Sequence, residues 1–194
     1  GTLLKSRRQE IHGEIAQTLE VNFSARVENQ PELLAHHFTN AGMVDEAIAY
    51  WRQAAAMAIS RSAYREALNH FTAALELLQR QSETKERDRL ELDIRVAQGV
   101  VCIATTGYSS PAVEEICLRA RQLCADLGDL QRIFPVLRGL WNLYVDRADL
   151  ITALEYAQNL VAQAELEKNL ERVALANRAL GFTCVLLRSE EHTS

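Results

Sequence analysis

The sequence predicts an all-α fold in which antiparallel helix pairs stack into a solenoid. Strong helix formers dominate, because Ala and Leu occur 27 times each whereas Pro occurs 3 times and Gly 8 times. Apolar residues recur at helical spacing along almost the whole chain, and no segment shows convincing two-residue alternation. A motif of small and bulky residues also repeats along the chain. Such repeats are typical of solenoids, in which each helix pair buries its apolar face against the next pair.

Composition limits the class of partner. The chain has 194 residues, of which 48% are hydrophobic and 24% charged, and its net charge is -5. This charge leaves no positive excess for nucleic acid, and no run approaches the roughly 20 apolar residues of a membrane span. We therefore expect no nucleic-acid and no membrane partner. The 4 Cys fit reduced thiols in a cytoplasmic protein better than a disulfide framework.

The expected helices follow one another through short links. The first is predicted by an apolar stripe and is followed by a loop over 20–30. Pro31 suits the first turn of the next helix, and Gly42 suits its C-terminal cap. The stripe consists of Leu3, Leu4, Ile11, Ile15 and Leu19. Later helices are expected at about 45–61, 64–81, 84–105, 111–127, 130–145, 149–166 and 169–187.

Polar residues mark two of the helix starts and one helix face. Thr84 can cap the helix that follows it, and Ser109 or Ser110 can cap the helix that begins at Pro111. The stretch 83–95 alternates acidic and basic residues, which predicts a solvated helix face with ion pairs four residues apart.

The repeated motif places a small residue, a bulky residue four positions later and a small residue three positions after that. Trp51 lies in one copy and precedes the first residue of the next by sixteen positions, the spacing of a tetratricopeptide-like helix pair. Trp51 should then pack against a helix on each side. The two copies are Ala47, Trp51, Ala54 and Ala67, Phe71, Ala74.

A looser period of 40 residues continues the pattern. It relates the pairs Val100-Val101, Leu140-Trp141 and Leu180-Gly181, and separately Val113 and Ala153. The spacing exceeds the 34 residues of the common tetratricopeptide repeat, so the helices or loops should be longer. We interpret the fold as a right-handed tetratricopeptide-like superhelix; a generic helical bundle with Ala-rich stripes is the alternative.

Five stretches carry a resemblance to a known family: 3–12, 30–38, 41–51, 106–114 and 134–141. Together they resemble the helical-repeat region of large bacterial signal-transduction ATPases, the predictive or STAND-type ATPases. Many members of that family carry an N-terminal class III adenylate/guanylate cyclase domain. The resemblance implies a linker helix at 1–29 after an absent ATPase and winged-helix module, and a repeat array at 30–187.

The two ends suggest that the sequence is a piece of a longer protein. The chain starts at Gly1 without Met or a signal-peptide pattern. Residues 188–194 resemble the translation of a common sequencing adapter, and we expect a non-native tail there; a natural polar tail is the alternative. Either way, His192 should not be a ligand.

The sequence contains no recognisable active-site motif. No Glu-x-x-His, Cys-x-x-Cys, Gly-x-Ser-x-Gly or phosphate-binding loop motif occurs. His36 and His37 are adjacent on one helix and point about 100° apart. Cys117 and Cys124 should be small buried hydrophobic residues. We predict no catalytic, metal-binding or cofactor-binding residues and no cofactor, so this fragment should not be an enzyme.

One set of polar residues suggests a binding groove. When the 40-residue units are aligned, Gln98, Arg138 and Arg178 occupy the same position in successive units. Arg95 and Asn142 lie on neighbouring helical turns. Arginine forks suit carboxylates and peptide carbonyls by geometry and charge. Exposed polar positions without a function are the alternative. The candidates are Gln98, Arg138 and Arg178, with Arg95 and Asn142 beside them.

Three functional hypotheses follow from these observations. The first is a non-catalytic scaffold that binds a protein, a peptide or the parent's own ATPase domain. The second is a small-ligand sensor that controls an autoinhibited ATPase, and an independent helical enzyme ranks last. We also expect self-association through the apolar faces of the terminal helices.

Overall fold

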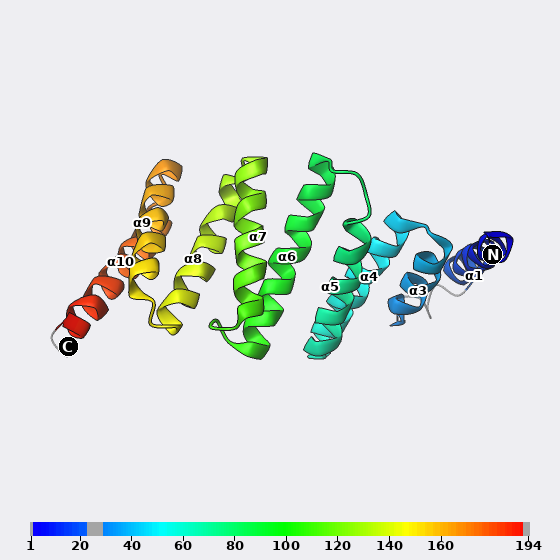
Figure 1. Ribbon diagram of the computed structural model, residues 1–194, viewed down its shortest axis with the longest axis horizontal. Coiled ribbons are helices and arrows are strands. Elements are labelled where there is room, and N and C mark those ends of the chain that lie inside the picture. Colours follow the sequence, from blue (N-terminus) through cyan, green and yellow to red (C-terminus); the bar gives the residue numbers. More distant parts are fainter. Residues whose placement is uncertain (1, 23–28, 192–194) are drawn as a thin grey trace. The chain divides into compact units, whose positions relative to one another are not determined.

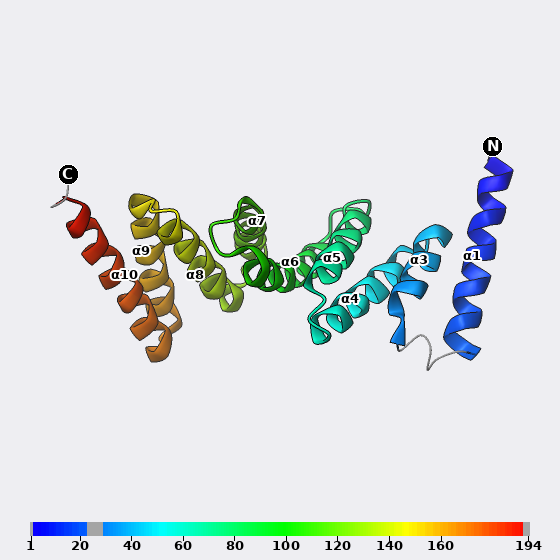
Figure 2. The same cartoon turned by 90° about the horizontal axis from the view of Figure 1, so that it is seen from below.

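The computed structural model describes residues 2–22 and 29–191, and over these residues the protein is all-helical (Figures 1 and 2). The described part contains no β-strand, which confirms the predicted fold class. The helices are α1 (Thr2–Asn22), α3 (Pro31–Ala41), α4 (Val44–Ser60), α5 (Tyr64–Leu78), α6 (Lys85–Thr106), α7 (Pro111–Leu127), α8 (Leu130–Asp146), α9 (Leu150–Glu167) and α10 (Leu170–Glu191).

The chain divides into two compact units, residues 1–94 and residues 95–194, with the division inside α6. In unit 1, α1 packs on α3, α3 on α4 and α4 on α5. In unit 2, α7 packs on α8, α8 on α9 and α9 on α10. Within each unit the chain therefore reverses at short turns, and helices that are neighbours in sequence are neighbours in space (Figure 1).

The core of unit 1 is centred on Trp51. This residue is only 5% exposed, and its indole packs edge-on against His36 of α3 and stacks on His70 of α5. The predicted two-sided packing of Trp51 is thus confirmed. All six residues of the two small–bulky–small motifs are buried: Ala47, Trp51, Ala54, Ala67, Phe71 and Ala74.

The core of unit 2 is built in the same way from closely spaced small residues. Val113 of α7 and Ala153 of α9, which are 40 positions apart in the sequence, are both fully buried. In the companion series Leu140 is fully buried and Val101 is 3% exposed, whereas Val100 is 66% exposed. Residues related by the 40-residue spacing are therefore not all equally buried.

The predicted helix ends are formed by local polar contacts. Gly42 and Gly128 adopt left-handed conformations, with φ of 80° and 66°, and close α3 and α7. The Ser110 hydroxyl accepts the backbone N–H of Ala112 at the start of α7. The Thr84 hydroxyl likewise accepts the N–H of Arg87 at the start of α6.

The apolar stripe of α1 is largely exposed, as expected for a terminal helix, but both terminal helices extend beyond their expected bounds. Leu3 and Leu4 are 86% and 81% exposed, and among the described residues of α1 Ala16 is the buried one. The α1 helix also runs into the expected loop, to Asn22. At the other end α10 continues to Glu191, past the expected end at 187, while His192 lies outside the described residues.

The alternating charge run is only partly a solvated face. Arg87 forms the predicted ion pairs with Glu83 and Glu91, at 3.9 and 3.6 Å. Glu91, however, is only 4% exposed, and the Arg87 side chain is 11% exposed. The pair therefore lies partly in the core of unit 1, where an ion pair is less screened by solvent.

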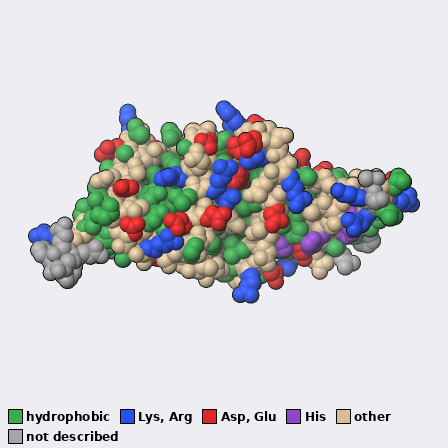
Figure 3. Space-filling model, in the orientation of Figure 1, with side chains coloured by type: hydrophobic (Ala, Val, Ile, Leu, Met, Phe, Trp, Pro, Cys, Tyr) green, Lys and Arg blue, Asp and Glu red, His purple; other side chains and the backbone are tan. Residues whose placement is uncertain are grey.

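Two surface properties bear on partners. Among the described residues, none of the helices combines the length and apolar character that crossing a membrane requires. Acidic and basic side chains are interspersed on the face of each unit drawn in Figure 3. On this face, charged sites are therefore local rather than parts of an extended patch of one sign.

Candidate partner-binding site

Unit 2 contains an apolar pocket of about 210 Å³ between α6, α7 and α8. Residues four or three positions apart on α6 lie on one helix face and form one wall, while α7 and α8 supply the others. The apolar lining residues are Val96, Gly99, Val100, Ile103, Tyr108, Ile116, Cys117, Ala120, Pro135, Val136 and Gly139.

Two glycines lie at the walls of the pocket. A methyl group added at Gly99 would lie 3.4 Å from Ile116, and one at Gly139 would lie 3.5 Å from the Cys117 sulfur. Both distances are ordinary van der Waals contacts, so an alanine would fit at either position. The exposed Val100 and Pro135 show that the pocket opens to solvent.

The polar residues of the pocket are three arginines and one asparagine: Arg95, Arg132, Arg138 and Asn142. No aspartate or glutamate is among the lining residues. Arg138 is exposed, and within the part of the chain that the structure describes its guanidinium has neither a hydrogen bond nor an ion pair. Asn142 donates from Nδ2 to the Arg138 backbone carbonyl at 3.0 Å. The Oδ1 atom of Asn142 can therefore accept a hydrogen bond from another donor.

The structure brings together most, but not all, of the residues expected in a groove. Arg95, Arg138 and Asn142 line this pocket. Arg138 and Arg178 also line a smaller hollow of about 30 Å³ between α8, α9 and α10, beside Trp141. Gln98 lines neither, because it is buried on the α6 face that carries Cys102. No described group hydrogen-bonds to its Oε1.

Sequence reasoning missed the contacts that hold the loop over the pocket. Tyr108, a lining residue, lies in the loop between α6 and α7. Arg147, which follows α8, donates from Nε to the Ser109 carbonyl at 3.0 Å and forms an ion pair with Glu114 at 2.5 Å. These contacts join α8 to the loop and to the first turn of α7, so Arg147 positions the segment that carries Tyr108.

Glu114 is the centre of this cluster. It also accepts a hydrogen bond from the Tyr144 hydroxyl at 2.8 Å. The hydrogen bond from Arg147, followed by that from Tyr144, lowers the pKa of Glu114. Burial and the hydrogen bond to Glu114 raise the pKa of Tyr144 to about 12. Across the physiological pH range Glu114 is therefore an ionised acceptor and Tyr144 a neutral donor.

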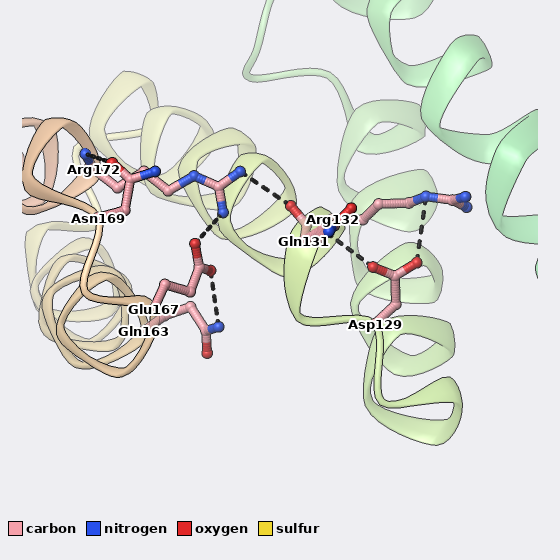
Figure 4. A network of polar contacts seen from close by, with 7 residues as sticks. All are labelled: Asp129, Gln131, Arg132, Gln163, Glu167, Asn169 and Arg172. Carbon is pink, nitrogen blue, oxygen red and sulfur yellow. Dashed lines mark hydrogen bonds and ion pairs between the residues drawn. The ribbon is translucent and has the colours of Figure 1, made fainter.

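A second polar network supports the opposite end of α8 (Figure 4). Asp129 accepts the Arg132 backbone N–H at 3.1 Å and caps the helix, and its carboxylate also pairs with the Arg132 guanidinium at 3.3 Å. Arg172 of α10 forms an ion pair with Glu167 and donates to the Gln131 carbonyl at 3.3 Å. The pocket wall formed by α8 is thus held at both ends.

The cysteines near the pocket are not reactive thiolates. Burial raises the pKa of both Cys117 and Cys124 to about 11, so each is a neutral thiol at physiological pH. Both are buried, as the sequence predicted. The Cys117 side chain therefore acts in the pocket as a small apolar group.

The histidines that the structure describes all belong to unit 1, and the imidazoles in view in Figure 3 lie in one region of its surface. The Nδ1 atoms of His12 on α1 and His37 on α3 are 3.0 Å apart. His36 and His70 pack on Trp51 instead. Among the described residues, no group of three or more His, Cys, Asp or Glu side chains is arranged to hold a metal ion.

No family model matches the chain. It is 28% identical to the Uncharacterized protein R02095 of Rhizobium meliloti (strain 1021) over 141 residues. This match covers 72% of the chain but only 14% of that relative. The chain thus spans a small part of the length of the curated relative that it matches.

Proposed function

We propose that the chain is a non-catalytic protein-interaction module in which tetratricopeptide-like helix pairs form a right-handed solenoid. The observation that carries this proposal is the pocket of unit 2, an apolar hollow lined by Arg95, Arg138 and Asn142. A concave apolar surface with a few polar groups suits recognition. The same lining offers no carboxylate or imidazole for acid–base work, and burial keeps its thiol protonated.

Contacts between alternate helices support the solenoid part of the proposal. In unit 2 the Trp141 indole of α8 donates to the Thr183 hydroxyl of α10 at 2.9 Å, and Arg172 of α10 lies over the Phe134 ring of α8. Contact between a helix and the next but one is what stacked helix pairs require. In unit 1, Trp51 of α4 contacts the rings of His36 on α3 and His70 on α5, and so joins the two helices on either side of α4.

We further propose that this module serves a larger bacterial ATP-dependent signalling protein in the cytoplasm, with a nucleotide cyclase as one form of the parent. The family resemblance of the sequence is the basis for this assignment. The far greater length of the matched relative is consistent with a module of this size in a longer chain. Partner binding would then shift the population of the parent's conformations and thereby its activity.

Peptide selection against the chain 1–194 tests the binding function. A random peptide library on phage should yield sequences that bind the chain and lose binding when Arg138 and Arg178 are both changed to Ala. Arg52 and Arg65, which are exposed on unit 1, provide a control pair with the same change in net charge. Failure to enrich any sequence, or equal binding by both double variants, would contradict a partner groove in unit 2.

The second candidate is a small-ligand sensor, and the same pocket is the observation that favours it. An apolar hollow with a few polar groups is also how proteins bind metabolites. Its volume of about 210 Å³, however, is below the roughly 300–1,000 Å³ of pockets that enclose drug-sized ligands. The size therefore favours a side chain from a partner over a whole metabolite.

A further inference from the structure

The lining of the unit 2 pocket has a charge opposite to that of the chain. The protein carries a net charge of -5, yet three arginines and no acidic residue line this hollow. Arg132 is paired with Asp129, so Arg138 supplies the charge that is open to a ligand. A local cluster of one sign beside apolar walls attracts ligands of the other sign and strengthens their ion pairs by excluding water. The occupant should therefore combine an apolar group with negative charge.

Arg138 is placed to receive that charge. Its guanidinium is exposed and has no protein partner among the described residues, so an incoming carboxylate would break no existing bond. Arginine binds a carboxylate through two parallel hydrogen bonds. Asn142, one helical turn further along α8, can accept a backbone N–H at Oδ1, because its Nδ2 already donates to the Arg138 carbonyl.

We propose that this pocket binds an acidic segment of a partner protein, with an aliphatic side chain inside the hollow and a flanking carboxylate on Arg138. This inference rests on the proposed interaction function and specifies the partner's chemistry. The volume of about 210 Å³ suits one or two side chains, and the exposed Val96 and Val100 border the opening. Asn142 orients the bound backbone, which a free carboxylic acid does not have.

Fluorescence anisotropy with defined peptides tests the proposal on the chain 1–194. The probe is a fluorescein-labelled, capped peptide that alternates glutamate with leucine. Matched peptides carry lysine in place of glutamate or serine in place of leucine. Only the first should bind, and its affinity should fall as salt is added, because its ion pairs lie at a solvent-exposed rim.

Variants locate the binding site. Arg138→Gln should weaken binding of the acidic probe by about tenfold, whereas Arg52→Gln, with the same loss of charge on unit 1, should not. Val100 is 66% exposed, so its substitution leaves the core intact. Val100→Asp should weaken binding and Val100→Lys should preserve it, because the two differ in the sign of charge at the pocket opening.

The outcomes separate this inference from the proposed function. Equal binding of the lysine or serine peptide, or no effect of Arg138→Gln, would overturn it. If phage selection yields binders without the acidic–aliphatic pattern, the interaction function stands and this inference fails. Sodium octanoate that binds while the peptide does not would also overturn it, in favour of a small ligand.

Discussion

The contact between His12 and His37 shows how one pair of side chains couples helix packing to pH. With their Nδ1 atoms 3.0 Å apart, one imidazole must donate and the other must accept, so the contact holds when at most one ring is protonated. Few other side chains fasten α1, because most of its residues are exposed. Protonation of both rings would therefore place two N–H groups face to face at the junction of α1 and α3.

Stability should fall as the pH is lowered through the range in which histidine titrates. Burial, followed by the charges of His12 and His36, lowers the pKa of His37 from 6.5, and burial also lowers that of His70. Between these lowered pKa values and about 6.5 the unfolded chain binds more protons than the folded chain, so the free energy of unfolding falls as the pH is lowered through this range.

Urea titrations between neutral and mildly acidic pH measure this effect. His37→Gln and His70→Gln should each reduce the loss of unfolding free energy on acidification, and the double variant should reduce it further. A wild-type chain whose stability does not change over this range would contradict the expectation for both imidazoles.

At the scale of helices, the unusual feature is Pro135 inside α8. Proline lacks a backbone N–H, so the carbonyl of Gln131 one turn earlier loses its partner within the helix. Arg172 of α10 donates to that carbonyl at 3.3 Å (Figure 4). The carbonyl that Pro135 leaves without a partner in α8 thus accepts a hydrogen bond from α10.

Pro135→Ala should couple energetically to Arg172→Ala. Restoration of the helical bond at Gln131 should stabilise α8 by about 1 kcal/mol, less than the full cost of about 3 kcal/mol for proline in a helix interior, because Arg172 already satisfies the carbonyl. The loss from Arg172→Ala should then be smaller in a chain that already carries Pro135→Ala. A double-mutant cycle from urea unfolding measures this coupling, and strictly additive changes would show that the two sites are independent.

Helix positions could be predicted from the sequence because they depend on neighbours along the chain. Gly42 and Ser110 act within a few residues, and the structure confirms both caps. The spacing of the motif around Trp51 relates consecutive helices, and its two-sided packing is also confirmed. The supports of the candidate site could not be predicted in this way. Arg147 reaches Ser109 over 38 residues and Arg172 reaches Gln131 over 41, so these contacts depend on how the helices pack.

The candidate groove residues illustrate the same limit. A repeat period fixes which residues correspond, but a shift of one helical position turns a side chain by about 100°. Arg138 is exposed at a pocket, whereas Gln98, its counterpart 40 residues earlier, is buried. Sequence spacing could therefore identify the helices that carry a surface but not every residue on it.

At the scale of the whole molecule, exposed apolar side chains on both terminal helices predict self-association. Leu3 and Leu4 on α1 are 86% and 81% exposed, and Val185 on α10 is 68% exposed. Contact of these residues between copies would remove apolar area from water and stabilise the association by about 25 cal/mol per Å².

Sedimentation velocity should show a weight-average mass that rises with protein concentration. Leu4→Glu and Val185→Glu should shift the chain toward monomer, whereas Ile151→Glu on α9, at a residue 66% exposed, should not. A single monomeric species at high concentration, or an equal effect of Ile151→Glu, would contradict association through the terminal helices.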